Sequence, residues 1–265
     1  MPYGGAVPIE TGVLVLALVG GAAYVVRGIT GGASAVVFNA LFGLAIAFGL
    51  TGGLTLLDGL YWVSLGDLVA GFLLLWILRR QIRLEPFLVR FLIVSVPLNV
   101  AFTLLAPHLD VTHLTLGLGI AIALAGTYLT AQREIHTWDE PTLVRRALPG
   151  GILAGALGGL YGMAGPVTVI YLAHAGSDPG RYRARLTTLS VFWSSFRIAT
   201  LVLAGQLTLP AVARFGVTLP AILVGLAIGV RLHPHVGPDR FRRLLGITVM
   251  VAGVLLVVRT LTAGG

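Results

Sequence analysis

The sequence predicts an all-α polytopic membrane protein built from two inverted-topology repeats, each a glycine-broken helical hairpin followed by three transmembrane helices. Three observations predict this class: the composition, a series of apolar runs of span length, and a glycine-rich break in each half of the chain. Of the 265 residues, 57% are hydrophobic and 11% are charged, whereas a soluble domain carries about 25% charged residues. Backbone polar groups in lipid must be satisfied internally, and continuous apolar runs without two-residue alternation favour helices over a barrel.

Apolar runs of about 20 residues, the length that a bilayer core requires, recur along the chain. They lie at 60–78, 87–105, 113–131, 186–204, 209–230 and 244–260. Residues 12–28 form a further apolar segment, with no basic region before it and no cleavage site followed by a mature domain. We therefore expect this first segment to be an uncleaved membrane segment.

The arginines predict the topology. All basic residues are arginine, and most of them gather in four segments, while the loops between these segments carry Asp58 and Asp110 instead. The positive-inside rule makes the arginine-rich segments cytoplasmic and places both termini outside. These segments are 79–86, 132–147, 176–185 and 231–243. Charge distributed over membrane loops in this way indicates the lipid bilayer, and not nucleic acid, as the partner of the basic residues.

Two segments must therefore enter and leave the membrane on the same face. Residues 148–175 begin and end inside, and residues 12–50 begin and end outside. Each contains a break: GGLYGMAGPVTVIY at 158–171 and VVRGITGGASAVVF at 25–38. Clustered glycine and proline do not suit an uninterrupted membrane helix, so each break is interpreted as the tip of a helical hairpin.

The two breaks align with each other. Gly31 corresponds to Gly165, and Ser34 corresponds to Thr168. Three spans follow each hairpin, and because three is odd, the second copy is inverted. This arrangement predicts a first repeat at 1–131, a cytoplasmic linker at 132–147 and a second repeat at 148–265. Inverted repeats with broken helices in corresponding positions are typical of secondary transporters, with the site at the repeat interface.

The second half also carries a longer pattern: GALGGLYGMAGPVTVIYLAHAGSDPGRYRARLTTLSVFWSSFRIATLVLAGQLT. This segment contains the break, an Asp-Pro-x-Arg loop and a polar-then-Arg helix, and in these features the chain resembles the sulfite exporter family of TauE/SafE-like permeases over nearly its whole length. The first half departs from the family, with Asn39 near the usual position of a proline. The resemblance implies transport of sulfite, organosulfonates or related anions. We therefore expect an exporter of such an anion in the inner membrane, and not an enzyme.

The chemistry of the breaks suits an anion independently of the family. A helix N-terminus exposes unpaired N–H groups and a partial positive charge, and glycines let a ligand approach the backbone. The predicted substrate-binding residues are Thr30, Gly31, Gly32, Ala33, Ser34, Ala164, Gly165, Pro166, Val167, Thr168, Trp193, Ser194 and Arg197. The alternative is that the glycines only permit close helix packing, which suits the small-xxx-small series Gly151, Gly155 and Gly159.

Charged residues within apolar segments are further candidates, and three of them are considered. Arg197 is about eleven residues into its predicted span, too deep to reach water easily. Because a charge at this depth is costly, Arg197 is a candidate for a functional residue. Asp67 is the corresponding charge of the first half, and Arg27 ends the first apolar segment. Asp67 and Arg27 are assigned as charge partners or coupling residues. Two alternatives stay open: a structural pair of Asp67 with Arg197 or Arg27, and an Arg27 that reaches the headgroups.

Other functions find less support. Without cysteine there is no thiolate site, His233 and His235 suggest a solvated loop more than a metal site, and no Walker A motif occurs. We expect no metal and no cofactor. The alternative function is an intramembrane enzyme that uses Asp67 and a histidine on a lipid-borne or small polar substrate. Such an enzyme would not require a duplicated break, so the repeat favours transport. Asn39 and Asn99 are interpreted as interhelical hydrogen-bonding residues. A homodimer is left open.

Overall fold

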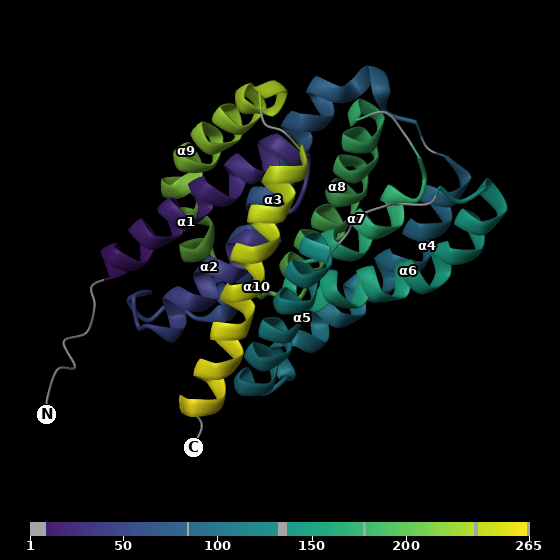
Figure 1. Ribbon diagram of the computed structural model, residues 1–265. Helices are drawn as coiled ribbons and strands as arrows, with labels where there is room; N and C mark the ends of the chain where they lie inside the picture. Colours follow the sequence, from purple (N-terminus) through teal and green to yellow (C-terminus); the bar gives the residue numbers. More distant parts are fainter. Residues whose placement is uncertain (1–8, 84, 132–136, 177–178, 236–237, 264–265) are drawn as a thin grey trace, which may run out of the picture.

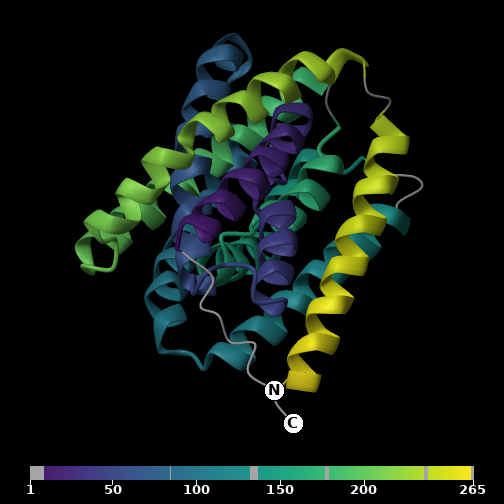
Figure 2. The ribbon, with the colours of Figure 1, turned by 90° about the vertical axis from the view of Figure 1, so that its left-hand side faces the viewer.

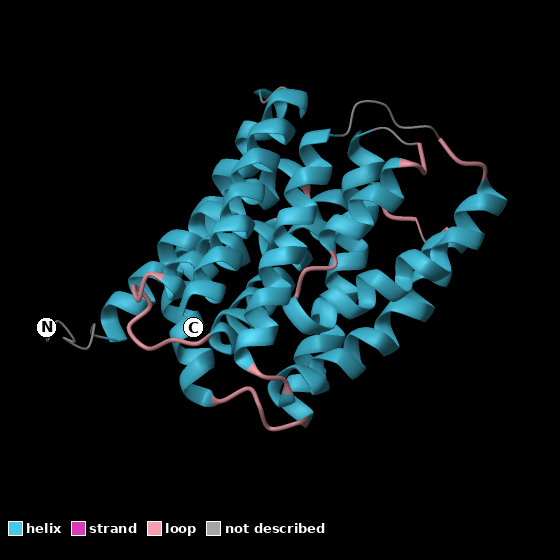
Figure 3. Ribbon diagram, turned by 60° about the horizontal axis from the view of Figure 1, so that its bottom comes forward, coloured by secondary structure: helices cyan, strands magenta, loops and turns pink. Residues whose placement is uncertain are grey.

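The computed structural model describes residues 9–83, 85–131, 137–176, 179–235 and 238–263 (Figure 1). Within these residues all regular secondary structure is helical, with loops between the helices and no strand (Figure 3), which confirms the predicted all-α class. The helices are α1 (Ile9–Thr30), α2 (Ser34–Ala47), α3 (Leu56–Leu78), α4 (Pro86–Leu105), α5 (Val111–Ala131), α6 (Glu140–Tyr161), α7 (Gly165–Ala173), α8 (Pro179–Leu203), α9 (Leu209–Leu232) and α10 (Pro238–Ala263). Short 3₁₀ turns follow three of them: η1 (Arg79–Gln81), η2 (Ala106–His108) and η3 (His233–His235).

Six of the helical segments are long and apolar enough to cross a membrane. They are Thr11–Thr30, Leu56–Gln81, Pro86–His108, Val111–Tyr128, Gly180–Leu203 and Leu209–His235. Five of the predicted runs and the predicted first segment coincide with these spans, and the run at 244–260 lies in α10. The chain is therefore a multi-pass membrane protein.

Local sequence signals explain where several helices begin. Thr55 and Asp58 form a reciprocal capping box at the start of α3, in which each side chain accepts a hydrogen bond from the backbone N–H of the other. α4 begins with Pro86, and Pro210 is the second residue of α9; the missing N–H of a proline costs nothing in the first turn. Thr208 also caps α9 by accepting from the backbone N–H of Ala211 at 3.4 Å.

Both predicted breaks are present. α1 ends at Thr30 and α2 begins at Ser34, while α6 ends at Tyr161 and α7 begins at Gly165. The backbone turns through left-handed conformations at Gly31, with φ +81°, and at Gly162, with φ +64°. A side chain at either position would be strained, so the glycines that the sequence clusters here are required to end the first helix of each pair.

Glycines also set the closest helix contacts. A Cβ added to Gly28 of α1 would lie 2.6 Å from the carbonyl oxygen of Leu226 in α9. A Cβ on Gly155 would lie 2.6 Å from the Ser95 carbonyl oxygen, so α6 packs directly on the backbone of α4. α5 and α10 meet in the same way (Figures 1 and 2). The packing interpretation of Gly151, Gly155 and Gly159 is thereby confirmed, because all three face α4.

Parts of the predicted cytoplasmic segments fall outside the described residues. Residues 132–136 belong to the predicted linker, and 236–237 belong to the last arginine-rich segment. The later part of the predicted linker is helical, since α6 begins at Glu140. The start of α1 and the end of α10 lie toward the same end of the bundle (Figures 1 and 2). The orientation of that end, outside, remains a prediction from the arginines.

Cysteine labelling tests this orientation, because the chain contains no cysteine of its own. Leu109 follows η2, and Arg181 lies near the start of α8; both are exposed. In intact cells, a membrane-impermeant maleimide should label Leu109→Cys and should not label Arg181→Cys until the cells are opened. Labelling of Arg181→Cys from outside would contradict both the assigned orientation and the same-face hairpin at 148–175.

Candidate functional site

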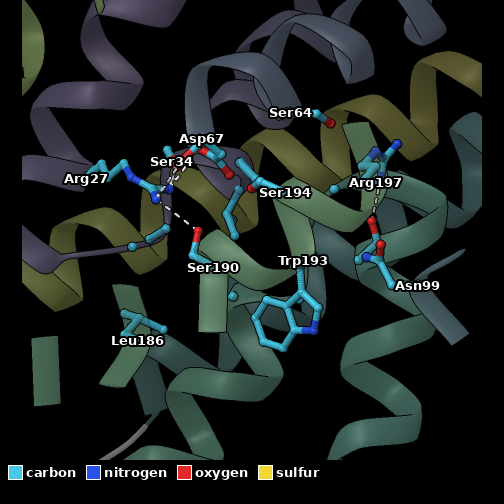
Figure 4. A pocket seen from close by; sticks show the side chains of 18 residues that line it. Arg27, Ser34, Ser64, Asp67, Asn99, Leu186, Ser190, Trp193, Ser194 and Arg197 are labelled. Atoms are coloured by element: carbon cyan, nitrogen blue, oxygen red, sulfur yellow. Dashed lines mark hydrogen bonds and ion pairs between the residues drawn. The ribbon is translucent and has the colours of Figure 1, made fainter. Parts of the chain in front are cut away.

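A pocket lies inside the bundle where the two helix breaks meet (Figure 4). The volume that the centre of a water-sized sphere can reach in this pocket is about 40 Å³. By the same measure one water molecule needs roughly 10–15 Å³, so the pocket has room for a small ion. Its lining residues come from α2, α3, α4, α6, α8, both breaks, the end of α1 and the start of α7. They are Arg27, Gly32, Ala33, Ser34, Ala35, Val36, Ser64, Asp67, Asn99, Gly158, Gly162, Ala164, Gly165, Leu186, Ser190, Trp193, Ser194 and Arg197.

The first helical residues of α2 and α7 face this pocket. A Cβ added to Gly165 would lie 3.9 Å from the backbone nitrogen of Ala33, so the two breaks lie side by side. Ala33 has φ +65° and is the non-glycine residue with a left-handed backbone in the described chain. Such a conformation is unfavourable for an alanine and is found where surrounding structure imposes it, often at functional sites. It directs the start of α2, at Ser34, into the pocket.

One end of the pocket holds a buried ion pair. Arg27 donates from Nη1 to Asp67 Oδ1 at 2.8 Å, and from Nη2 to Ser190 Oγ at 2.9 Å. Asp67 Oδ1 also accepts from Ser34 Oγ at 2.7 Å and from the Tyr24 hydroxyl at 2.9 Å. Of the predicted alternatives, the Asp67–Arg27 pair is therefore the one present. Arg27 is only 1% exposed and does not reach the surface.

Arg197 lies at the other end of the pocket, on α8 (Figure 4). It is 3% exposed and donates through Nη1 to the backbone carbonyl of Gly158 in α6. Its Nε has no hydrogen-bond partner among the described residues. No carboxylate of the described chain lies within the 4.0 Å ion-pair distance of its guanidinium. A buried arginine with no counter-charge is costly in a low-dielectric interior.

Two other predicted residues of α8 also line the pocket. Trp193 is 6% exposed, packs beside Phe91 and donates from Nε1 to Ser95 Oγ at 2.8 Å. This hydrogen bond fixes the ring against α4. Ser194 is also buried and lies between the two charged ends of the pocket.

Five predicted residues do not line the pocket: Thr30, Gly31, Pro166, Val167 and Thr168. For the two threonines, local bonding explains why. The Thr30 hydroxyl lies 2.9 Å from the carbonyl oxygen of Val26, one turn earlier in α1, and 2.5 Å from that of Gly32, so its single proton is used locally. The Thr168 hydroxyl donates to the Ala164 carbonyl at 2.8 Å, one turn earlier in α7. Thus Ser34 presents its hydroxyl to the pocket, whereas the aligned Thr168 uses its own within the helix.

The structure adds polar residues that the sequence prediction did not place in the site: Ser64, Ser190 and Asn99. Asn39 matches its interpretation, since Nδ2 donates to the Tyr161 carbonyl oxygen in the second half of the chain at 2.7 Å. Asn99 Oδ1, in contrast, is buried without a hydrogen-bond partner. In the sequence, Asn99 lies four residues after Ser95 and four residues before Thr103. This spacing could have shown that α4 carries a polar stripe.

The first break is packed closely against α8 on the side away from Arg197. Arg183 donates to the Gly28 carbonyl oxygen at 2.7 Å, and Thr187 donates to the Gly31 carbonyl oxygen at 3.3 Å. Nearby, Arg185 holds both carboxylate oxygens of Glu85 through Nε and Nη2, each at 2.6 Å. These contacts close the space between the break and the arginine-rich start of α8.

The sequence model of the family described as sulfite exporter TauE/SafE matches residues 16–256. The chain is also similar to the "Probable inner membrane transporter protein TsaS" of Comamonas testosteroni, with 30% identity over 118 residues. That alignment covers 42% of this chain and 49% of the relative, so the chain matches about half the length of that protein. No solved structure matches the chain significantly.

Proposed function

The chain belongs to the sulfite exporter TauE/SafE family, and from this premise we propose that it is a secondary transporter that exports a small sulfur-containing anion such as sulfite or an organosulfonate. The anion binds in the pocket between the two helix breaks. The relative in Comamonas testosteroni, itself described as a probable inner membrane transporter, supports transport as the activity.

Arg197 is the observation that carries this proposal. The buried ionic residues of the described chain are Arg27, Asp67, Arg185 and Arg197. The first two pair with each other and Arg185 pairs with Glu85, which leaves Arg197 without a carboxylate. An anion that enters the pocket supplies the missing counter-charge and offsets the cost of burying the guanidinium.

The edge of the Arg197 guanidinium that carries Nε, called its free edge below, suits a ligand with two oxygens. Its Nη1 is occupied by the Gly158 carbonyl, and its Nε is unpartnered. Arg185 binds the two carboxylate oxygens of Glu85 through its Nε and Nη2, which form the same edge of the guanidinium. This pair shows, within the same protein, how that edge binds an oxyanion. Sulfite and sulfonate groups each present two oxygens with a suitable separation for this fork.

The backbone adds a weaker attraction. α2 begins at Ser34 and α7 begins at Gly165, and both starts line the pocket. The first N–H groups of each helix have no intrahelical partner, and the helix dipole adds a partial positive charge at each start. Pro166 has no N–H to contribute, so α2 provides more donors than α7.

The pairing of the helices supports alternating access between two related halves. If α1–α5 are exchanged with α6–α10 in order, the α1–α9 pair becomes the α6–α4 pair, and both are extensive. The α3–α8 and α5–α10 pairs are converted into themselves. This correspondence is expected for inverted repeats around a shared central site, where one half can rock against the other.

The alternative of an intramembrane enzyme has no supporting observation at the pocket. Asp67 is engaged by Arg27, Ser34 and Tyr24, so it is not an unencumbered base. None of the residues that line the pocket is a histidine. Transport therefore explains the site with fewer assumptions than catalysis.

Flux in proteoliposomes tests the proposal. With one uncompensated cation in the pocket, the bound species is a monoanion, and its outward movement is driven by about 2.3 kcal/mol per 100 mV. Efflux of sulfite should therefore accelerate when a potassium diffusion potential makes the vesicle interior negative. Protein-free vesicles provide the control. Absence of flux for sulfite and organosulfonates would contradict the proposal, and flux that follows a pH gradient but ignores voltage would contradict uncoupled monoanion transport.

A further inference from the structure

α4 carries three buried polar side chains along one stripe: Ser95, Asn99 and Thr103. Their spacing of four residues places them on the same face of the helix. Ser95 accepts a hydrogen bond from Trp193 Nε1 at 2.8 Å, and Thr103 donates to the Gly159 carbonyl oxygen at 3.5 Å. Asn99, between them, is 1% exposed and lines the pocket, and its Oδ1 has no partner among the described residues. The middle member of an otherwise satisfied stripe thus presents an unused acceptor at the pocket.

An unpartnered acceptor at this depth calls for a hydrogen-bond donor in the occupied pocket. Burying a polar group without a partner is unfavourable, most of all where water cannot reach. The carboxamide oxygen of Asn99 can only accept. A fully deprotonated oxyanion has only acceptor oxygens, so it would leave Asn99 Oδ1 unsatisfied and add electrostatic repulsion. A ligand with one O–H group would satisfy it.

The charge of the pocket leads independently to the same ligand. Its ionic lining residues are Arg27, Asp67 and Arg197. The first two form an ion pair, so only one positive charge remains for the ligand. A dianion would bring one negative charge that nothing in the pocket compensates, which is strongly unfavourable in a low-dielectric interior. A monoanion is balanced.

We propose that Asn99 is a specificity-determining residue that accepts a hydrogen bond from the O–H group of a singly charged oxyanion, so that the pocket selects hydrogensulfite over the sulfite dianion. This inference rests on the proposed function. Arg197 binds two oxygens of the ligand through its free edge, and Asn99 Oδ1 accepts from the third. Arg197 and Asn99 lie next to each other at the same end of the pocket (Figure 4).

A matched pair of ligands tests the role of the O–H group. Methanesulfinate has the charge and the two free oxygens of hydrogensulfite, with a methyl group in place of the O–H. Dissociation constants are measured by calorimetry on the purified full-length protein at about pH 6, where hydrogensulfite predominates. We expect hydrogensulfite to bind at least roughly tenfold more tightly, because a site built to bond an O–H group rejects the analogue that lacks it.

Variants assign this preference to Asn99. Asn99→Leu, whose side chain has the same branched arrangement of heavy atoms, should weaken hydrogensulfite binding and leave methanesulfinate binding equal or stronger, which removes the preference. Thr103→Val is the matched control, because Thr103 belongs to the same stripe but does not line the pocket. This control should keep the wild-type preference.

The pH dependence gives a second readout that needs no variant. Between about pH 6 and about pH 8, hydrogensulfite loses its proton, so the apparent affinity for total sulfite should fall. Methanesulfinate does not titrate in this range and should bind equally well throughout. It therefore reports any titration of the ionisable groups that line the pocket, which are Arg27 on α1, Asp67 on α3 and Arg197 on α8, and of Tyr61 on α3, which interacts electrostatically with Arg197.

The outcomes separate the two proposals. If the wild-type protein binds hydrogensulfite and methanesulfinate equally, or binds total sulfite equally at both pH values, the role of Asn99 is wrong while the anion site stands. If it binds neither ligand, the proposed function is wrong as well. Should Asn99→Leu fail to fold, the ligand ratio and the pH dependence of the wild-type protein still decide.

Discussion

Replacement of Arg197 by methionine is expected to weaken anion binding at least about 100-fold, which corresponds to about 2.7 kcal/mol. The reason is that Arg197 provides the only uncompensated charge among the ionic residues that line the pocket, and a charge-assisted pair in a buried site is strong. Arg197→Lys should retain part of the binding, because an ammonium keeps the charge and loses the planar fork. In detergent, the rise in melting temperature on adding sulfite should disappear in the methionine variant and shrink in the lysine variant.

The stability of the empty protein distinguishes a binding role from a structural one. If Arg197 exists to hold an anion, Arg197→Met removes an unpaired buried charge, and the melting temperature without ligand should stay the same or rise. A mainly structural role, through the bond to the Gly158 carbonyl, would lower it. Arg259→Ala serves as a control, since Arg259 is an exposed arginine over the Phe48 ring, away from the pocket. A well-folded Arg197→Met protein with wild-type anion affinity would exclude Arg197 from the site.

Asp67→Asn is expected to lower the free energy of unfolding by about 3–5 kcal/mol. The variant keeps an oxygen for Ser34 and Tyr24, but it leaves Arg27 buried without its counter-charge. The pocket then has two uncompensated guanidinium groups, so anions should bind more tightly and restore part of the lost stability. Chemical unfolding with and without sulfite, followed by circular dichroism, measures both effects.

Two further variants make this result specific. Arg27→Met/Asp67→Leu removes both charges and should recover most of the stability, because a buried pair replaced by apolar groups is often neutral. Asp58→Asn breaks the pair with Arg214 but keeps an oxygen for the Thr55 backbone N–H of the capping box. The Arg214 side chain is 31% exposed and the Asp58 side chain is 27% exposed. That change should cost no more than about 1 kcal/mol. Equal losses from Asp67→Asn and Asp58→Asn would show that Asp67 does not compensate a buried charge.

The sequence by itself was sufficient to predict the membrane class and the places where the helices break. Both depend on short-range physics. Apolar composition over about 20 residues decides whether a segment can lie in lipid, and the left-handed turns at Gly31 and Gly162 need glycine wherever those residues end up in the fold. For the same reason, the close-packing glycines of α6 were recognisable from their spacing of four residues.

Only the tertiary structure decided which charges are paired and which are free. Arg27 and Asp67 are forty residues apart, and their contact depends on how α1 and α3 are rotated about their axes. That rotation is set by close contacts with other helices, such as Gly28 on α9 and Gly155 on α4. Helical spacing shows which side chains share a face, but not which neighbour that face meets. Packing of helices from both halves brings the Arg197 guanidinium and the Asn99 side-chain oxygen to one pocket. Among the described residues, this packing supplies no carboxylate for the first and no hydrogen-bond donor for the second.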